Sequence, residues 1–510
     1  MLSQLALLPV LLPLIGAPAC AVLRRPTAAW AFASTVAVLA FVAAAALLQA
    51  TARQGVIHYA FGGWAAPWGI EYRIDLLNAF VLLLVSGIAA VVLVASRASV
   101  WHDIAENRRT LFYVACLLCL AGWLGIAATG DAFNLFVFLE ISSLATYALV
   151  ACGRDRQALV AAFNYLVMGT IGATFILIGI GFIYMLTGTL NMADLAQRLP
   201  GLGESRTVFA AYAFIVVGVC LKLALFPLHL WLPGAYTQAP AIVTAYVAAT
   251  ATKVALYVLI RFSFSVFHLE SSRLALSLEA VFISLGVVAV FAGSLVAVFA
   301  SNLKRALAWS SIAQIGYMAV GVGIGTVAGV QASLIHLFNH ALMKGALFLA
   351  LAAIAMRVGG NELQALRGIG RRMPLTSAAI VVAGISLIGV PGTAGFISKW
   401  YLVTAALARE QWLLALLIVA GSLLTAVYIW RFVETAWLDQ NPAQPATPPQ
   451  EAPPLLLAGT LLLALANIYF GLDTRLPVGT AAGAAAGLLG DSAAGLLGHP
   501  PAPLPGAGAP

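Results

Sequence analysis

Long apolar runs recur along almost the whole chain and are separated by short polar connections. Each run holds about 20 residues, the length that a helix needs to cross roughly 30 Å of hydrocarbon. About fourteen runs can be counted, over residues 2–23, 28–50, 74–97, 110–128, 131–151, 157–187, 207–226, 239–262, 275–299, 304–325, 328–356, 374–405, 411–436 and 453–471. The pattern predicts an all-α, polytopic membrane protein of about fourteen transmembrane helices.

The two ends of the chain differ from the rest. The first run has no basic stretch before it and no small-residue cleavage site, so we interpret it as a retained span that begins the mature chain at Met1. Residues 476–510 are rich in Ala, Gly and Pro, and we expect them to form a flexible extension.

Composition and charge agree with a membrane protein. The 510 residues are 62% hydrophobic and 9% charged, and the mean hydropathy is +1.00. The formal charge of +8 does not indicate nucleic-acid binding, because the basic residues are spread over short connections. They fall on every second connection: Arg24 and Arg25; Arg97, Arg108 and Arg109; Arg154 and Arg156; Lys304 and Arg305; Arg357, Arg367, Arg371 and Arg372. That face is expected to be cytoplasmic, with both termini on the other side of a bacterial inner membrane.

Cysteines and soluble-enzyme motifs add no chemistry. All five cysteines lie in or at the ends of apolar runs, without a second Cys pair or a nearby His, so we interpret them as packing residues. No Gly-rich phosphate loop, dinucleotide motif or Ser/His/Asp arrangement is present. We therefore expect neither a cofactor nor a metal, and we expect the function to lie inside the membrane.

Buried ionisable residues are the first functional candidates, since charge inside a bilayer is expensive. Glu140 lies inside "GDAFNLFVFLEISSLATYALV", whereas most other acids lie at span ends or in loops. Four lysines also lie in apolar runs: Lys222, Lys253, Lys344 and Lys399. A desolvated lysine releases its proton readily and a neighbouring carboxylate restores it, whereas arginine stays charged. One such lysine could be structural, and Glu140 could be a protonated hydrogen-bonding group, but the set favours proton transfer.

Two histidines extend this set. His336, His340 and Lys344 are spaced i, i+4 and i+8 in "SLIHLFNHALMKGALFLA", so they share one helix face, with Asn339 beside it. Neutral imidazole can accept and donate a proton, which predicts a hydrated relay. A metal site is the alternative, but no carboxylate or cysteine accompanies the stripe.

Two runs contain helix breakers near a lysine. Pro227 and Pro233 follow Lys222 in "KLALFPLHLWLPGA", and Pro391 and Gly392 in "IGVPGTAGFISKW" are expected to stand in the same relation to Lys399. Non-helical backbone persists in a membrane only where protein or a water-filled cavity satisfies it, so each break predicts a cavity. Two broken helices five spans apart predict internal repeats, and an odd number of spans in each repeat makes them inverted.

The expected organisation follows from this spacing. Helices 7 and 12 are discontinuous, and two inverted five-helix repeats are flanked by other spans. The segments are residues 1–109 (helices 1–3), 110–262 (helices 4–8), 275–436 (helices 9–13), 453–471 (helix 14) and the tail 476–510.

Several of these stretches carry a resemblance to a known family. "FPLHLWLPGAYTQAP", "LKRALAWSSIAQIGYM", "HLFNHALMKGALFL" and "GTAGFISKW" occur in the order typical of the antiporter-like, proton-translocating membrane subunits. Respiratory complex I, Mrp-type cation/proton antiporters and membrane-bound hydrogenases share these subunits, and the resemblance covers about residues 70–435. With "TGTLNMADLA", the stretch around Glu140 most resembles the D-type subunit of the Mrp-type antiporters.

The resemblance implies a role for each candidate. Glu140 and Lys222 would form an ion pair between helices 5 and 7, and Lys253 would lie at the centre. His336, His340 and Lys344 would connect it to Lys399, the terminal lysine on broken helix 12. Asn302, Gly234 and Gln238 stand where the family often has acids, which leaves open the proton entry route and any role of Lys304.

The resemblance further implies that the chain assembles with other membrane subunits into a hetero-oligomer in the lipid bilayer. It implies that this chain moves protons, and Na⁺ is a further candidate ion for the whole complex. A gradient-driven antiporter and a redox-driven complex both fit, since no site for electrons, nicotinamide or quinone is visible in this chain. A stand-alone secondary transporter and an inert membrane scaffold are the more distant alternatives.

Overall fold

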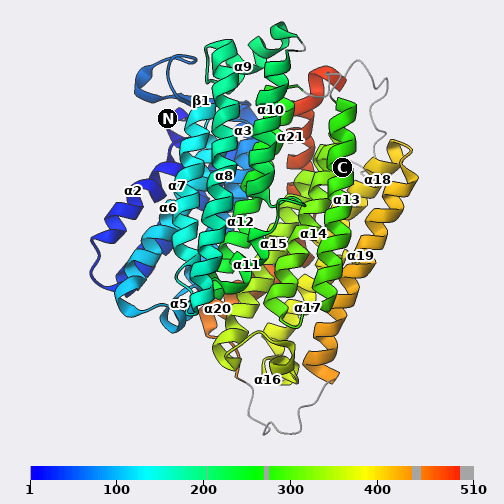
Figure 1. Cartoon of the computed structure of the whole chain (residues 1–510). Coiled ribbons are helices and arrows are strands. Elements are labelled where there is room, and N and C mark those ends of the chain that lie inside the picture. The colour runs from blue at the N-terminus through cyan, green and yellow to red at the C-terminus, as the bar shows by residue number, and fades with distance from the viewer. Residues whose placement is uncertain (1, 204, 269–274, 439–449, 494–510) are drawn as a thin grey trace, which may run out of the picture.

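The computed structural model describes residues 2–203, 205–268, 275–438 and 450–493, and most of them are helical (Figure 1). Within these residues, twelve helices are long and apolar enough to cross a membrane. Three shorter apolar helices are α2 (Leu8–Ala21), α17 (Pro374–Ile388) and α18 (Ala394–Ala408). Counting α2 as one span and the consecutive α17 and α18 as another gives the expected fourteen. The prediction of an all-α polytopic membrane protein is confirmed.

The twelve long helices follow the predicted runs closely. They are α3 (Pro26–Gln54), α4 (Leu76–Ala95), α6 (Arg109–Ala128), α7 (Ala132–Val150), α8 (Arg156–Thr187), α10 (Arg206–Leu223), α12 (Ala241–Ile260), α13 (Ala275–Phe299), α14 (Leu303–Ile324), α15 (Val327–Val358), α19 (Trp412–Val433) and α20 (Pro454–Leu472). Polar residues mark several starts: the Asp131 side chain accepts a hydrogen bond from Asn134 N at 2.7 Å and so caps α7. π-helical turns at Arg261–Val266 and Glu434–Leu438 extend α12 and α19.

Several short elements lie at the two ends of the bundle (Figure 1). At the upper end, β1 (Ile57–Ala60) and β2 (Glu71–Ile74) form an antiparallel hairpin with Ile57 opposite Ile74. The remaining short helices are α1 (Leu2–Leu5), α5 (Arg97–Asp103), α9 (Met192–Arg198), α11 (Trp231–Gln238) and α16 (Ile369–Arg372). α9 lies at the same end as the hairpin, whereas α5 and α16 lie at the opposite end.

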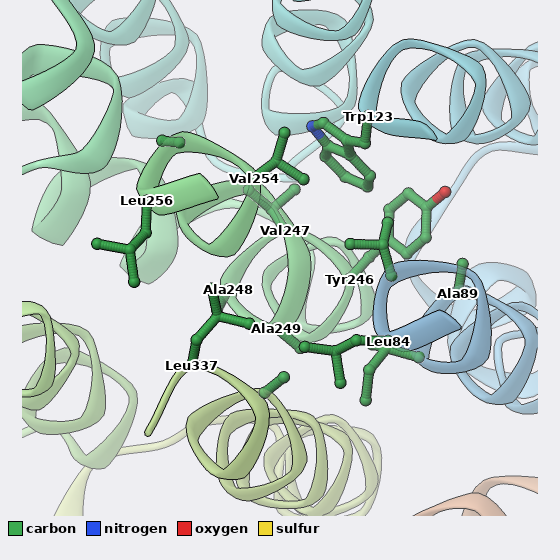
Figure 2. Close-up of a cluster of buried hydrophobic side chains, with 14 of the residues drawn as sticks. Leu84, Ala89, Trp123, Tyr246, Val247, Ala248, Ala249, Val254, Leu256 and Leu337 are labelled. Atoms are coloured by element: carbon green, nitrogen blue, oxygen red, sulfur yellow. The ribbon is translucent and has the colours of Figure 1, made fainter. Parts of the chain in front are cut away.

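Helix α12 lies at the centre of the bundle. All but one of its residues are buried, and it packs against α4, α6, α10 and α15. Figure 2 shows Ala248 and Ala249 on the side of α12 that faces Leu337 of α15. Small side chains allow two helices to approach closely, which is how membrane helices gain packing energy in the absence of a hydrophobic driving force.

A second close contact holds α10 against α8. A Cβ atom on Gly218 would overlap the backbone oxygen of Gly172, so the two helices touch through their backbones. Gly218 is one turn before Lys222, and this contact therefore fixes the end of α10 that carries the lysine.

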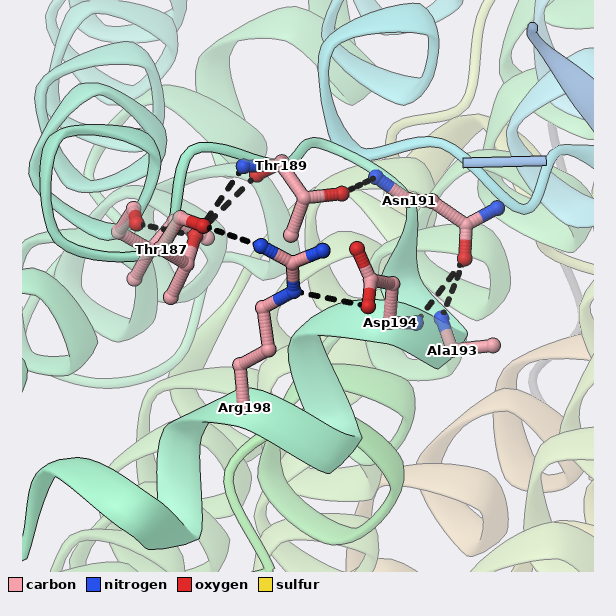
Figure 3. A network of polar contacts seen from close by, with 7 residues as sticks. Thr187, Thr189, Asn191, Ala193, Asp194 and Arg198 are labelled. Atoms are coloured by element: carbon pink, nitrogen blue, oxygen red, sulfur yellow. Dashed lines mark hydrogen bonds and ion pairs between the residues drawn. The ribbon is translucent and has the colours of Figure 1, made fainter. Parts of the chain in front are cut away.

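The connection from α8 to α10 carries a polar network at the hairpin end (Figure 3). Arg198 donates hydrogen bonds to Asp194 Oδ1 at 2.8 Å and to Thr187 O at 2.9 Å, and Asn191 caps α9. Desolvation opposes ionisation of Asp194, but the hydrogen bonds from Arg198 and Thr189 and the charge of Arg198 outweigh it and lower the pKa of Asp194. The network is therefore fully formed at neutral pH and weakens as the pH falls through that lowered pKa.

The C-terminal region differs from the prediction. Where a flexible tail is expected from residue 476, α21 (Arg475–Ala493) continues after α20 and packs along α4 and α15. Alanine is the best helix former, and the Ala- and Gly-rich face packs closely, since a Cβ on Gly483 would lie 2.6 Å from Leu76 Cδ2. Residues 494–510 lie outside the described part of the chain.

Candidate functional site

Glu140 and Lys222 face each other from two neighbouring helices. Glu140 lies in the middle of α7, and its Oε1 is 3.5 Å from the Nζ atom of Lys222, the residue before the last of α10. Lys222 also donates a hydrogen bond to Ser143 Oγ at 2.8 Å. The Glu140 side chain is 26% exposed and the Lys222 side chain 10%, so the acid is the more exposed member of the pair.

The first helix break lies directly beyond Lys222. α10 ends at Leu223, Ala224 adopts a left-handed conformation, and Pro227 lies in the non-helical segment before α11. The Trp231 indole donates to Leu221 O at 2.8 Å, so a side chain from the second half-helix bonds a carbonyl group in the last turn of α10. Pro233, expected at the break, is instead the third residue of α11, where a missing N–H costs no helical hydrogen bond.

A small cavity connects this pair to the centre of the bundle. It measures about 40 Å³ and is lined by Ser142, Ser143 and Lys222 on one side and by Val254 and Val258 of α12 on the other. Roughly 10–15 Å³ accommodates one water molecule when polar partners are present. The cavity can therefore hold water between Lys222 and the helix that carries Lys253.

Lys253 is the central lysine and is completely buried. Its amine donates hydrogen bonds to Ala248 O and to Thr252 Oγ1, the latter at 3.3 Å. Within the described residues no carboxylate forms an ion pair with it. Its charged form is held only by neutral acceptors, an environment in which a lysine gives up a proton easily.

The histidine stripe lies on α15, and the two imidazoles differ sharply. The rings of His336 and His340 are nearly parallel, with centroids 6.1 Å apart. His336 is bonded at both nitrogens, to Ser398 Oγ at 2.8 Å and to Gln314 Oε1 at 3.0 Å. His340 is completely buried, and neither of its nitrogens has a hydrogen-bond partner among the described residues. A buried polar ring without a protein partner indicates a place for ordered water.

Lys344 continues the stripe one turn further. Its amine donates to Leu307 O at 2.7 Å and to Ser310 Oγ, both on α14. Helices α12 and α15 pack against each other, and Lys253, His340 and Lys344 are all completely buried in this part of the bundle. The three side chains, from α12 and α15, therefore form one group in the core.

Lys399 lies at the second helix break, which contains Pro391 and Gly392. α17 ends at Ile388, and the Lys399 amine donates to Leu387 O, Ile388 O and Ser422 Oγ, each at 2.9 Å. The amine thus lies at the C-terminal end of a half-helix, where the free carbonyl groups favour a positive charge. Ser398, next to Lys399, contacts His336, and this joins the histidine stripe to the break.

The expectation that both lysines stand in the same relation to their breaks is wrong. Lys222 lies before its break, on the first half-helix, whereas Lys399 lies after its break, on the second half-helix α18. Lys399 satisfies the carbonyl groups of the preceding half, a task that Trp231 performs at the first break. Sequence spacing to a proline does not determine which half the side chain contacts.

The site also contains polar residues that the sequence analysis missed. Each bonds a predicted residue from a neighbouring helix: Ser143, Ser310, Gln314, Ser398 and Ser422. A serine in a membrane helix usually bonds its own backbone, so its identity alone gives no signal. Lys304, whose role the sequence leaves open, is buried and donates to Ala239 O beside α11.

The arrangement suits proton transfer better than metal binding. The predicted residues lie on α7, α10, α12, α15 and α18, helices that pack against one another in the core. Among the described residues, no group of three His, Cys, Asp or Glu could hold a metal ion, and the five cysteines are free. Amines, imidazoles and hydroxyls at this depth can hold a proton and release it.

Comparisons with known proteins identify the family. The model of the NADH:quinone oxidoreductase/Mrp antiporter transmembrane family matches residues 129–425. The N-type subunit of NADH-quinone oxidoreductase from Desulforudis audaxviator is 41% identical over 92% of this chain and 96% of its own. The D-type subunit of the Na⁺/H⁺ antiporter from Bacillus subtilis is 29% identical over 93% of this chain and 95% of its own.

Solved structures give the same answer. A chain of the Mrp complex from Dietzia sp. DQ12-45-1b superposes with a TM-score of 0.87 at 26% identity, covering 96% of this chain and 97% of that one. A chain of the archaeal membrane-bound sulfane sulfur reductase superposes with a TM-score of 0.87 at 30% identity, covering 97% of this chain and 100% of that one. With the sequence matches and the polytopic fold, these findings establish that the chain belongs to the NADH:quinone oxidoreductase/Mrp antiporter transmembrane family.

Proposed function

We propose that this chain is the proton-translocating subunit of a multisubunit membrane complex. Protons move along Glu140, Lys222, Lys253, His336, His340, Lys344 and Lys399. The observation that carries this proposal is the row of amines and imidazoles in the core, which are at most one tenth exposed and are held mainly by neutral groups.

The Glu140–Lys222 pair controls the first step. Two unit charges about 4 Å apart attract by roughly 4 kcal/mol at an effective dielectric constant of about 20. While Glu140 is beside Lys222, the lysine keeps its proton. Because Glu140 has the more exposed side chain of the two, a neighbouring subunit can draw it away, and Lys222 then passes its proton inward.

The later steps use the hydrated core. Water in the 40 Å³ cavity carries the proton from Lys222 toward α12, and Lys253 receives it. His340 and Lys344 share the next position, and His336 hands the proton to the Ser398 and Lys399 side. The charge that collects on Lys399 is stabilised by the end of α17 until the next proton repels it to the far side.

The energy source has two candidates, each favoured by a different observation. The NADH-quinone oxidoreductase relative has the higher identity, 41% against 29%, which supports a redox-driven assembly. The TM-score to a chain of the Mrp complex is 0.87, against 0.74 to a chain of respiratory complex I from Thermus thermophilus, which supports a gradient-driven antiporter over a complex I assembly. A chain of the sulfane sulfur reductase, an archaeal respiratory complex, also gives a TM-score of 0.87, so a redox-driven assembly with this fold stays equally supported. In both cases this chain moves protons in a bacterial inner membrane, with any Na⁺ path in another subunit.

Reconstitution of the intact complex tests the proposal. We expect Glu140→Gln and Lys222→Ala each to abolish proton uptake into proteoliposomes, measured with an internal pH-sensitive dye, while blue native electrophoresis shows normal assembly. Arg198→Ala is the matched control, because it removes a cation that is not one of the proposed proton carriers. Wild-type uptake in the Lys222→Ala complex would contradict the proposal.

A further inference from the structure

The last span contains a third break that the proton pathway does not use. α20 ends at Leu472, α21 begins at Arg475, and Asp473 and Thr474 lie between them. Asp473 accepts the backbone N–H of Arg475 at 3.2 Å, so it starts the second half-helix.

Two contacts locate this break near the middle of the membrane. A Cβ on Gly471 would lie 2.5 Å from Gly392 O, so α20 ends against the break between α17 and α18. These half-helices have 15 residues each, which places their break about midway across. Gly483 lies against Leu76, the first residue of the membrane-crossing α4, and Arg475 is eight residues before it, about 12 Å deeper.

The break presents an ion pair on the outer surface of the bundle. Arg475 Nη2 and Nε donate to the two oxygens of Asp473 at 2.7 and 2.9 Å. The Arg475 side chain is 90% exposed and that of Asp473 is 26% exposed. These hydrogen bonds use two of the five guanidinium N–H groups, which leaves three donors for a further partner. Lipid cannot accept these hydrogen bonds, so an exposed guanidinium at this depth is expensive unless another protein covers it.

The surroundings of the pair form an apolar surface suited to a helix. A groove of about 580 Å³ runs between α3, α4, α15 and α20, and its lining includes Phe41, Leu83, Phe338, Leu462, Phe470 and Leu476. The outward face of α20 continues it with large exposed side chains at helical spacing: Leu462, Leu465, Tyr469 and Leu472. A polar anchor in such a surface gives register as well as affinity.

We propose that the groove and the exposed face of α20 form a docking surface for a transmembrane helix of a neighbouring subunit, which presents a carboxylate to Arg475 at mid-membrane depth. A carboxylate matches the planar guanidinium and satisfies its remaining donors. The inference rests on the part of the proposed function that assigns the chain to a multisubunit complex. It does not depend on the proton-transfer residues.

Photo-crosslinking in the native complex tests the surface. A benzophenone amino acid replaces Leu472, which is 75% exposed beside the ion pair. Irradiation of membranes that contain the whole complex is expected to join this chain to one other membrane subunit, identified by mass spectrometry. Adducts with lipid alone would overturn the proposal.

Variants of the ion pair test the carboxylate. With the probe at position 472, Arg475→Leu is expected to lower the yield of the crosslinked subunit at least fivefold, and Asp473→Leu with Arg475→Leu to lower it similarly. Arg198→Leu is the matched control, since Arg198 is also paired with an aspartate but lies outside the membrane. An unchanged yield in the Arg475→Leu variant would overturn the role of the guanidinium.

The outcomes separate this inference from the proposed function. A chain that migrates alone on a blue native gel would overturn both. A chain that migrates in a complex and pumps protons, but whose position 472 meets only lipid, would overturn the docking surface alone. Loss of pumping in the Lys222→Ala complex with an intact crosslink would support both independently.

Discussion

At the scale of single residues, the two buried imidazoles of the proposed pathway differ in what surrounds them. His336 is fixed at both nitrogens by Ser398 and Gln314, whereas His340 has no partner among the described residues. Burying the His340 ring costs free energy, because it removes the ring from water and no hydrogen bond from the described residues replaces the lost ones. Core stability alone therefore does not explain a histidine at this position. His340 is thus the ring best placed to exchange a proton with water.

Leucine substitutions at the two proposed proton carriers are expected to differ in their effect on stability. Replacing His336 removes its hydrogen bonds to Ser398 and Gln314 and leaves the buried Gln314 Oε1 without its partner, so His336→Leu is expected to lower the free energy of unfolding by about 1–3 kcal/mol. His340→Leu removes no protein hydrogen bond and is expected to keep stability near that of the wild type while proton uptake falls. Thermal unfolding in detergent and proteoliposome uptake measure the two effects; equal destabilisation by both variants would argue against this distinction.

The sequence identifies the charged members of the site, but not their neighbours. Lys222, Lys253, Lys344 and Lys399 stand out because charge is rare in apolar runs. Ser310 and Ser422 are ordinary polar residues in such runs, and only the packing of α14 and α19 brings them to a lysine. Asp75 was also missed: it pairs with Arg261 at 2.7 Å at the hairpin end, and each lies at a span boundary, where charge is common.

At the scale of helices, breaks differ in how visible they are. The Pro227 and Pro391 breaks can be predicted because proline cannot continue a helix. The α20–α21 break was missed because the Ala- and Gly-rich composition after it suggested a tail. Its signal was an aspartate at 473 and a proline at 477, which are typical of a helix start. The inverted relationship between the two five-helix groups stays a prediction.

The second break depends on a glycine. A Cβ atom on Gly395 of α18 would overlap the backbone oxygen of Ser386 on α17, so the half-helices pack backbone to backbone. Gly395→Ala is expected to cost about 1–3 kcal/mol or more of stability and to displace Lys399 from its carbonyl partners.

The matched control is Gly181→Ala on α8, where nothing lies within 4 Å of the added carbon. That variant is expected to be neutral or to gain about 0.5–1 kcal/mol from alanine's helix propensity. Unfolding temperatures and proton uptake of the two variants provide the comparison. A Gly395→Ala protein with wild-type stability and uptake would show that the half-helices can separate without loss.

At the scale of the whole molecule, the arrangement of charge predicts orientation. The Arg-rich connections near Arg154 and Arg367 are expected to face the cytoplasm, and the hairpin and α9 to face outward. In a cysteine-free background, a membrane-impermeant maleimide added to intact cells should label Leu202→Cys but not Arg154→Cys. The reverse pattern would invert the assigned orientation and with it the direction of proton movement.

Number and order of spans could be predicted from the sequence because each must cross the same thickness of hydrocarbon. How the spans pack could not, because lipid-facing and core-facing helices have similar composition. α12, almost wholly buried, and α19, largely exposed, are both simply apolar. Small residues such as Gly172 and Gly218 decide which helices touch.

The most direct test of the central claim is the number of protons moved per turnover of the intact complex carrying Lys253→Leu. Lys253 is completely buried at the centre, so nothing outside the membrane is altered. If protons cross through the row of amines and imidazoles, the complex assembles and turns over but moves fewer protons per cycle than the wild type. An unchanged proton count would contradict a path through this core.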